Sequence, residues 1–153
     1  MRGARPLLQL REPPRSERPR GLAIIADAAA LAAAQEVLST IGNATPVCGA
    51  DCVCQQPTPC PATLSVPPGT NVEAGCLYAQ QAGFVTGGRN GSQKVTASAG
   101  TSNPPPTAPG VNDLLYWATY TVEDNGPRLF SAIFGKGENR IAVRSTAAIT
   151  NGV

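Results

Sequence analysis

A run of twenty residues over 22–41, LAIIADAAALAAAQEVLSTI, contains neither glycine nor proline. Alanine and leucine are the strongest helix formers, and Gly42-Asn43 follows as a stop signal, so we predict a helix over Leu22–Ile41. Its length of about 30 Å matches a bilayer core. Asp27 and Glu36 make it a poor spanning segment, because each carboxylate at membrane depth costs about 2.5 kcal/mol or more.

The large apolar residues of this helix follow a regular spacing. Ile24, Leu31 and Leu38 recur every seven residues and form one apolar stripe, with Asp27 beside it. Two interpretations follow. Either the helix lies in the core of the protein with one carboxylate at its edge, or it packs on a partner in an assembly and its carboxylate contacts that partner. The sequence favours the first. The helix-packing candidates are Ile24, Asp27, Leu31 and Leu38.

The segment before this helix has a different composition. Residues 1–20 contain six arginines, two glutamates and four prolines. Proline removes backbone donors and restricts the preceding residue, so we expect a disordered basic leader. A flank on the cytoplasmic side of a membrane segment is the other interpretation. We therefore divide the chain into a leader at 1–20 and a folded region at 21–153.

Five cysteines accompany a proline-rich insert at about 46–68. The disulfide candidates are Cys48, Cys52, Cys54, Cys60 and Cys76. Cross-links suit a long connection with little apolar content, and they imply an oxidising compartment outside the cytosol. The spacing leaves the connectivity open, and an odd number leaves one thiol over or pairs it between chains. A zinc or thiol-redox module using Cys48, Cys52, Cys54 and Cys60 is the alternative, although only Cys48/Cys52 has the spacing of a zinc knuckle.

The rest of the chain predicts an α+β fold with a small antiparallel sheet. Thr70 or Asn71 caps a second helix, and alternating aromatic and β-branched residues indicate strands. Asp124-Asn125-Gly126 is predicted as a turn. The remaining elements are a helix over Asn71–Phe84, a strand over Lys94–Ala99, a strand over Leu114–Val122, a short packed helix over Pro127–Gly135 and a strand over Arg140–Thr150.

Composition excludes several classes of function. Lys and Arg number 12 against 10 Asp and Glu, a formal charge of +2, which does not favour nucleic-acid binding. The chain has no histidine, so the usual general base and the usual catalytic triad are missing. A hydrolase using Asp51, Asp113 or Asp124 has no supporting motif. We expect a protein that is not an enzyme, with no cofactor, no metal and no small-molecule substrate.

Three blocks in this order resemble the TadE/TadG-like family of bacterial Tad (Flp) pilus assembly. The first is ADAAALAAAQ at Ala26–Gln35, and the second runs from Tyr78-Ala79 to the glycine-rich turn at Gly91. The third is PRLFSAIFG followed by RIAVRSTAAI, over 127–149. The resemblance covers about residues 22–150 in discontinuous blocks. It implies a minor pilin-like or envelope assembly protein that associates with other pilus subunits.

The resemblance also implies a location. Members of that family begin with a hydrophobic membrane anchor just before the block that matches Ala26–Gln35, where this chain has the Arg/Pro-rich residues 1–20. We expect a mis-assigned start codon or a frameshift to have replaced the anchor. The implied protein is held at the inner membrane of the cell envelope, with its soluble part outside the cytoplasm.

Overall fold

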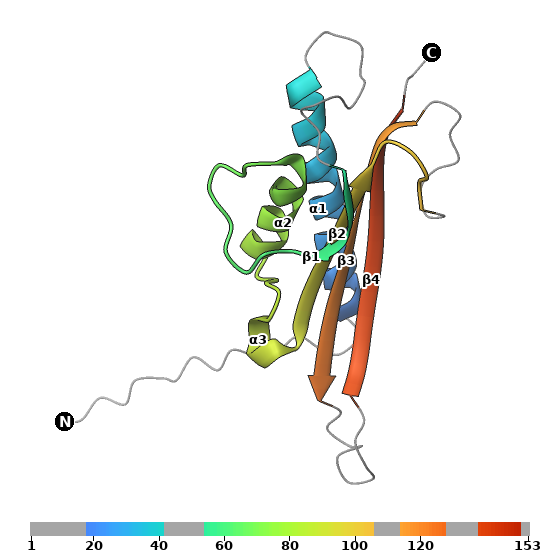
Figure 1. Ribbon diagram of the computed structural model, residues 1–153. Coiled ribbons are helices and arrows are strands. Elements are labelled where there is room, and N and C mark those ends of the chain that lie inside the picture. The colour runs from blue at the N-terminus through green and yellow to red at the C-terminus, as the bar shows by residue number, and fades with distance from the viewer. Residues whose placement is uncertain (1–17, 42–53, 106–113, 128–137, 151–153) are drawn as a thin grey trace, which may run out of the picture.

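A computed structural model describes residues 18–41, 54–105, 114–127 and 138–150 of the 153-residue chain (Figure 1). It confirms the predicted α+β arrangement, with helices on one side of a four-stranded antiparallel sheet. The elements are α1 (Arg18–Ile41), β1 (Gln55–Pro59), α2 (Asn71–Gln81), α3 (Gly88–Gly91), β2 (Gln93–Gly100), β3 (Leu114–Pro127) and β4 (Glu138–Thr150).

The sheet has the order β1-β2-β3-β4, and each neighbouring pair is antiparallel. The central strand β3 pairs with β2 from Gln93↔Asp124 to Gly100↔Trp117, and with β4 along its whole length. Alternate residues of a strand point to opposite faces, which gives the sheet an inner and an outer side. The inner side of β3 carries four fully buried residues: Tyr116, Ala118, Tyr120 and Val122.

Helix α1 runs alongside the strands and packs against α2, β3 and β4 (Figure 1). It begins at Arg18, earlier than predicted, and so takes in three residues assigned to the leader. Pro19 fits there because the first turn of a helix has no partner for a backbone N–H. The face of α1 in the core is made of small residues and two larger ones: Leu22, Ala26, Ala29, Ala30, Ala33, Ala34 and Val37.

Helix α2 is held against the sheet by polar contacts at its start. The Thr70 side chain accepts a hydrogen bond from the Glu73 backbone N–H, which confirms the predicted cap. The Tyr120 hydroxyl donates to the carbonyl of Val72 at 2.7 Å. The Asn71 amide donates to the Tyr116 hydroxyl. The hydroxyl groups of both tyrosines of β3 are therefore hydrogen-bonded inside the core, where an unpaired polar group is costly.

The predicted turn at Asp124-Asn125-Gly126 is wrong. These residues continue β3 and pair with Ile141, Arg140 and Asn139 of β4. Asp, Asn and Gly favour turns, but here a continuous ladder on a long partner strand outweighs that local preference. Pro127 also belongs to β3, so the predicted helix does not begin there, and 128–135 lies outside the described residues.

Candidate interaction surfaces

Helix α1 has a second, outward face made of large apolar residues. Ile24 is 68% exposed, Leu31 57% and Leu38 52%, and Asp27 between them is exposed as well. The helix enters the core, as the first interpretation holds, but it does so through another face, because the stripe itself is exposed. The other interpretation, a helix that packs on a partner, remains a prediction.

The packing of the core explains why these large residues face outward. Tyr116 and Tyr120 project from β3 toward the helices and are fully buried. Two side chains of that size fill the space beneath α1, and close packing then requires small residues opposite them. Alanines supply that surface, since Ala26, Ala29 and Ala33 are completely buried. The large residues of α1 are left for the opposite side.

Helix α1 is also long and apolar enough to cross a membrane, over Pro19–Ser39, by length and composition alone. A core helix of a soluble protein and an N-terminal signal sequence pass the same test. Here 39% of the apolar window is buried inside the protein. The helix is thus shared between the core and the surface of the folded domain.

A disulfide joins Cys60, just after β1, to Cys76 in α2. Both residues are buried, and the bond closes a loop with a sequence separation of 16. It ties the edge strand of the sheet to the helix layer across the long connection. A structural disulfide of this kind indicates an oxidising compartment outside the cytosol.

The remaining cysteine predictions have different outcomes. Cys54 is exposed and carries a free thiol, whereas Cys48 and Cys52 lie outside the described residues. The bond to Cys76 removes Cys60 from the four-thiolate set of the zinc hypothesis. Within the described ranges, no group of three or more potential metal ligands lies together.

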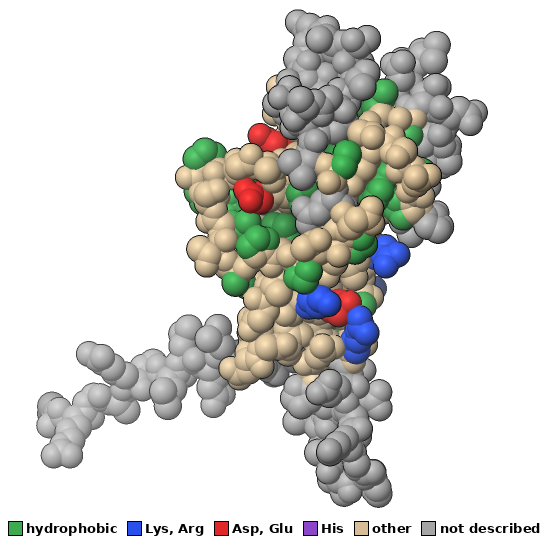
Figure 2. All heavy atoms as spheres, in the orientation of Figure 1, with side chains coloured by type: hydrophobic (Ala, Val, Ile, Leu, Met, Phe, Trp, Pro, Cys, Tyr) green, Lys and Arg blue, Asp and Glu red, His purple; other side chains and the backbone are tan. Residues whose placement is uncertain are grey.

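The outer side of the sheet carries a shallow polar groove with a volume of about 670 Å³. Its floor is a row of hydroxyl groups on β2 and β3, including those of Thr96, Ser98 and Thr121. Trp117 lies at one end, and its indole N–H donates a hydrogen bond to the Ser102 carbonyl at 2.9 Å. Glu123 lines the other end and forms an ion pair with Arg140 at 2.6 Å. Figure 2 shows basic side chains gathered around an acidic one over this part of the sheet. The groove offers hydrogen bonds, and several of its polar groups already bond to one another.

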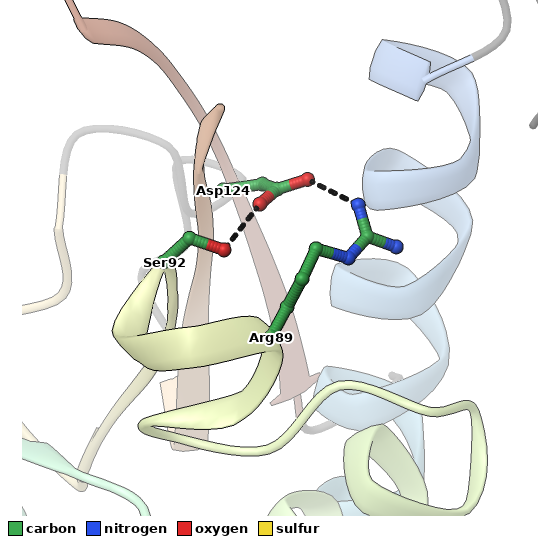
Figure 3. A network of polar contacts seen from close by, with 3 residues as sticks. All are labelled: Arg89, Ser92 and Asp124. Atoms are coloured by element: carbon green, nitrogen blue, oxygen red, sulfur yellow. Dashed lines mark hydrogen bonds and ion pairs between the residues drawn. The ribbon is translucent and has the colours of Figure 1, made fainter. Parts of the chain in front are cut away.

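Asp124, an acidic residue of the enzyme hypothesis, lies in a structural contact (Figure 3). Its carboxylate accepts hydrogen bonds from Arg89 and from the Ser92 hydroxyl, both at 3.2 Å. The backbone N–H of the next residue, Asn125, bonds to the Ser92 carbonyl at 2.8 Å. These bonds fasten α3 to the end of β3. Asp51 and Asp113 lie outside the described residues.

Among the described residues, two titratable groups in the core have displaced pKa values. Burial raises the pKa of the Tyr116 hydroxyl to about 12, against the hydrogen bond from Asn71, which lowers it. Burial also raises the pKa of Tyr120 well above the ordinary tyrosine value. Each hydroxyl has its partner on α2, so these tyrosines hold the fold together. Their pKa values are those of structural groups.

Sequence reasoning identified the stripe of α1 and the cysteines, but it missed the edge strand β1 and the outer groove. A signal for the groove was present in the alternation of Thr96 and Ser98 with the buried Val95 and Ala97 of β2. No family model matches the chain, and no curated protein or solved structure is significantly similar to it.

Proposed function

We propose that this protein is a component of Tad/Flp-type pilus assembly, a minor pilin-like or envelope assembly protein that acts by helix packing and protein association. The observation that carries the proposal is the outward face of α1. Three large apolar side chains on one helix, all more than half exposed, are typical of a surface that contacts another protein. The function is binding, and the protein is not an enzyme.

The resemblance to TadE/TadG-like proteins is the reason for proposing a role in pilus assembly. The first block of that resemblance, Ala26–Gln35, falls in the middle of α1. The second begins in α2 and ends at α3, and Arg140–Ile149 of the third falls in β4. The described parts of the three blocks therefore fall in helices and strands of one fold, which supports the resemblance.

The proposed location is the bacterial envelope, with inner-membrane anchorage and the soluble part outside the cytoplasm. The Cys60–Cys76 disulfide supports the compartment, because it suits oxidising conditions. The anchorage rests on the resemblance, whose members carry their anchor before the block that matches Ala26–Gln35, whereas α1 itself is part of the core. The partners are other pilus-assembly or pilin subunits and the membrane. We propose no nucleic-acid partner, since the net charge is only +2, and no small-molecule substrate, since the sequence has no nucleophile-elbow, P-loop or paired-carboxylate motif.

The first test is localisation in a bacterium that carries the gene beside a Tad locus. The chain is expressed with a C-terminal tag, once from Met1 and once from the longest upstream frame, and the cells are fractionated. We expect the longer form in the membrane fraction, with Cys60 and Cys76 protected from thiol-specific alkylation until a reductant is added. Deletion of the gene should abolish surface pili, and the longer form should restore them.

The proposal would be contradicted if both forms were recovered in the cytosol with reactive thiols and the deletion strain kept its pili. A metal assay on the same preparations addresses the zinc alternative. About one zinc per chain bound by reduced cysteines would favour the small metal-binding module.

A further inference from the structure

The exposed line of α1 has a spacing that is symmetric about its centre. Five exposed residues lie along the outward face of the helix: Ile24, Asp27, Leu31, Gln35 and Leu38. The intervals between them are three, four, four and three residues. Leu31 is the midpoint, with a polar residue four positions away on each side and a large apolar residue seven positions away on each side.

We propose that two copies of this chain associate through this face, with their α1 helices antiparallel and the twofold axis at Leu31. In that arrangement Leu31 meets Leu31 of the second copy, and Ile24 meets Leu38. Asp27 then lies opposite Gln35, whose amide donates to the carboxylate. A twofold interface needs a surface that is complementary to itself, and each residue on this line meets one of matching chemistry.

The neighbours of Leu31 allow the second helix to approach. Ala28 and Ala32 flank it on the outward side and are half-buried. Small residues beside a large one let two helices come close enough for the large side chain to fill the groove opposite. Ile24 and Leu38 each lie about 10 Å from Leu31 along the axis, so a shallow crossing angle keeps all three layers in contact.

A second copy fits this face better than a lipid surface does. Asp27 lies within the apolar line, and burying that carboxylate in hydrocarbon without a hydrogen-bond partner is costly. The opposing Gln35 provides the partner. The interface is small for a protein dimer, so we expect a reversible dimer with a dissociation constant on the order of 10 µM. This inference holds whether or not the protein works in a pilus.

The test is sedimentation equilibrium of the purified, oxidised full chain over a concentration series that spans the expected constant. Leu31→Asp places two carboxylates against each other at the axis and should weaken the dimer by about 100-fold. Tyr78→Asp on α2 is the matched control, because Tyr78 is 51% exposed and lies off this line. The control should leave the dissociation constant unchanged. Circular dichroism and the intact Cys60–Cys76 bond verify that both variants are folded.

A charge swap tests the antiparallel direction. Gln35→Glu places a carboxylate opposite Asp27 of the other copy and should weaken the dimer about tenfold. Adding Asp27→Lys should restore it, because a cation then faces the new carboxylate. In a parallel pair each position would meet itself, so Asp27→Lys would only exchange one like-charge pair for another, and the double variant would dimerise as weakly as Gln35→Glu.

Three results would overturn the proposal. One is a monomer at all concentrations up to about 1 mM, far above the expected constant. Another is a dimer that Leu31→Asp leaves intact, which would assign the contact to another face. The third is binding of the monomer to vesicles of phosphatidylethanolamine and phosphatidylglycerol that Leu31→Asp abolishes, which would make lipid the occupant.

Discussion

Gly75 of α2 lies close against α1 and β3. A Cβ atom at this position would overlap the ring and hydroxyl of Tyr120 and the backbone carbonyl of Ala29. The carbonyl belongs to α1, and the Tyr120 hydroxyl is bonded to Val72, so neither can move aside easily. We expect Gly75→Ala to lower the free energy of unfolding by about 3 kcal/mol, despite the better helix propensity of alanine.

The matched control is Gly21→Ala in α1. Nothing lies within 4 Å of a Cβ atom at Gly21, and the residue is an exposed part of the helix. The same substitution should therefore stabilise the protein by about 0.5–1 kcal/mol. Urea denaturation of both variants measures the difference. Equal effects of the two substitutions would mean that α2 does not approach α1 and β3 this closely.

The buried tyrosines make stability fall at alkaline pH. Below about pH 10 a tyrosine is protonated in the folded and the unfolded chain alike, so it adds no pH dependence. Above that pH the unfolded chain releases protons that the folded chain retains, because burial raises the pKa of Tyr116 to about 12 and that of Tyr120 as well. The unfolded state then binds fewer protons, and stability decreases as pH rises.

The slope steepens above about pH 10 and approaches about 1.4 kcal/mol per pH unit for each buried tyrosine. Urea denaturation at intervals between pH 9 and pH 11.5 measures it, with Tyr120→Phe compared against the wild type. The variant should be less stable at neutral pH, since it loses the bond to the Val72 carbonyl, and its slope should be shallower by one proton. An unchanged slope in Tyr120→Phe would show that Tyr120 ionises in the folded protein.

At the scale of elements, the disulfide sets how firmly the edge of the sheet is tied to the helices. The bond between Cys60 and Cys76 restricts the unfolded chain over a separation of 16 residues. Closing a loop of that length in the unfolded chain stabilises the folded protein by about 3 kcal/mol. The free energy of unfolding of the double variant Cys60→Ala, Cys76→Ala should be lower by about that amount, as measured by urea denaturation under oxidising conditions. Cys54→Ala removes the exposed free thiol and should change stability by less than about 0.5 kcal/mol, so comparable losses in both would argue against a structural bond.

Helices and central strands were the most predictable elements, because their signals are local. The run at 22–41 became α1, and the alternation from Tyr116 to Val122 became the inner face of β3. The face of α1 that enters the core was not predictable in the same way. Larger residues usually point inward, but that choice depends on the size of the side chains opposite, and here Tyr116 and Tyr120 come from a strand far away in sequence.

Strand β1 shows a second limit of the sequence. Its residues QQPTP contain two prolines and little β propensity, so nothing local predicts a strand. It forms because it lies at the edge of the sheet, where a proline without an N–H is tolerated, and because the Cys60 N–H bonds to the Val95 carbonyl just beyond it. The end of β3 has a similar origin, since Asp124 and Asn125 are held in the strand by β4 and α3.

At the scale of the whole molecule, α1 is part of the core that holds every layer together. Its inner face packs on β3 and β4, and its side packs on α2. Pulling α1 out into a bilayer would expose Tyr116, Tyr120 and the row of buried alanines to water. The free energy lost in the core would exceed what an alanine-rich helix containing Asp27 gains in lipid. The described part of the chain should therefore unfold as one cooperative unit.

Hydrogen exchange on the purified chain tests this arrangement. The amides in the middle of α1 and of β3 should exchange at the same slow rate, because both open only in global unfolding. Adding vesicles of phosphatidylethanolamine and phosphatidylglycerol should leave the rates of β3 unchanged, since the folded domain keeps α1. Gly75→Ala should accelerate α1 and β3 by the same factor. If vesicles made β3 exchange quickly while α1 stayed protected, α1 would have left the sheet for the membrane, and its place in the core would be only one of two states of the protein.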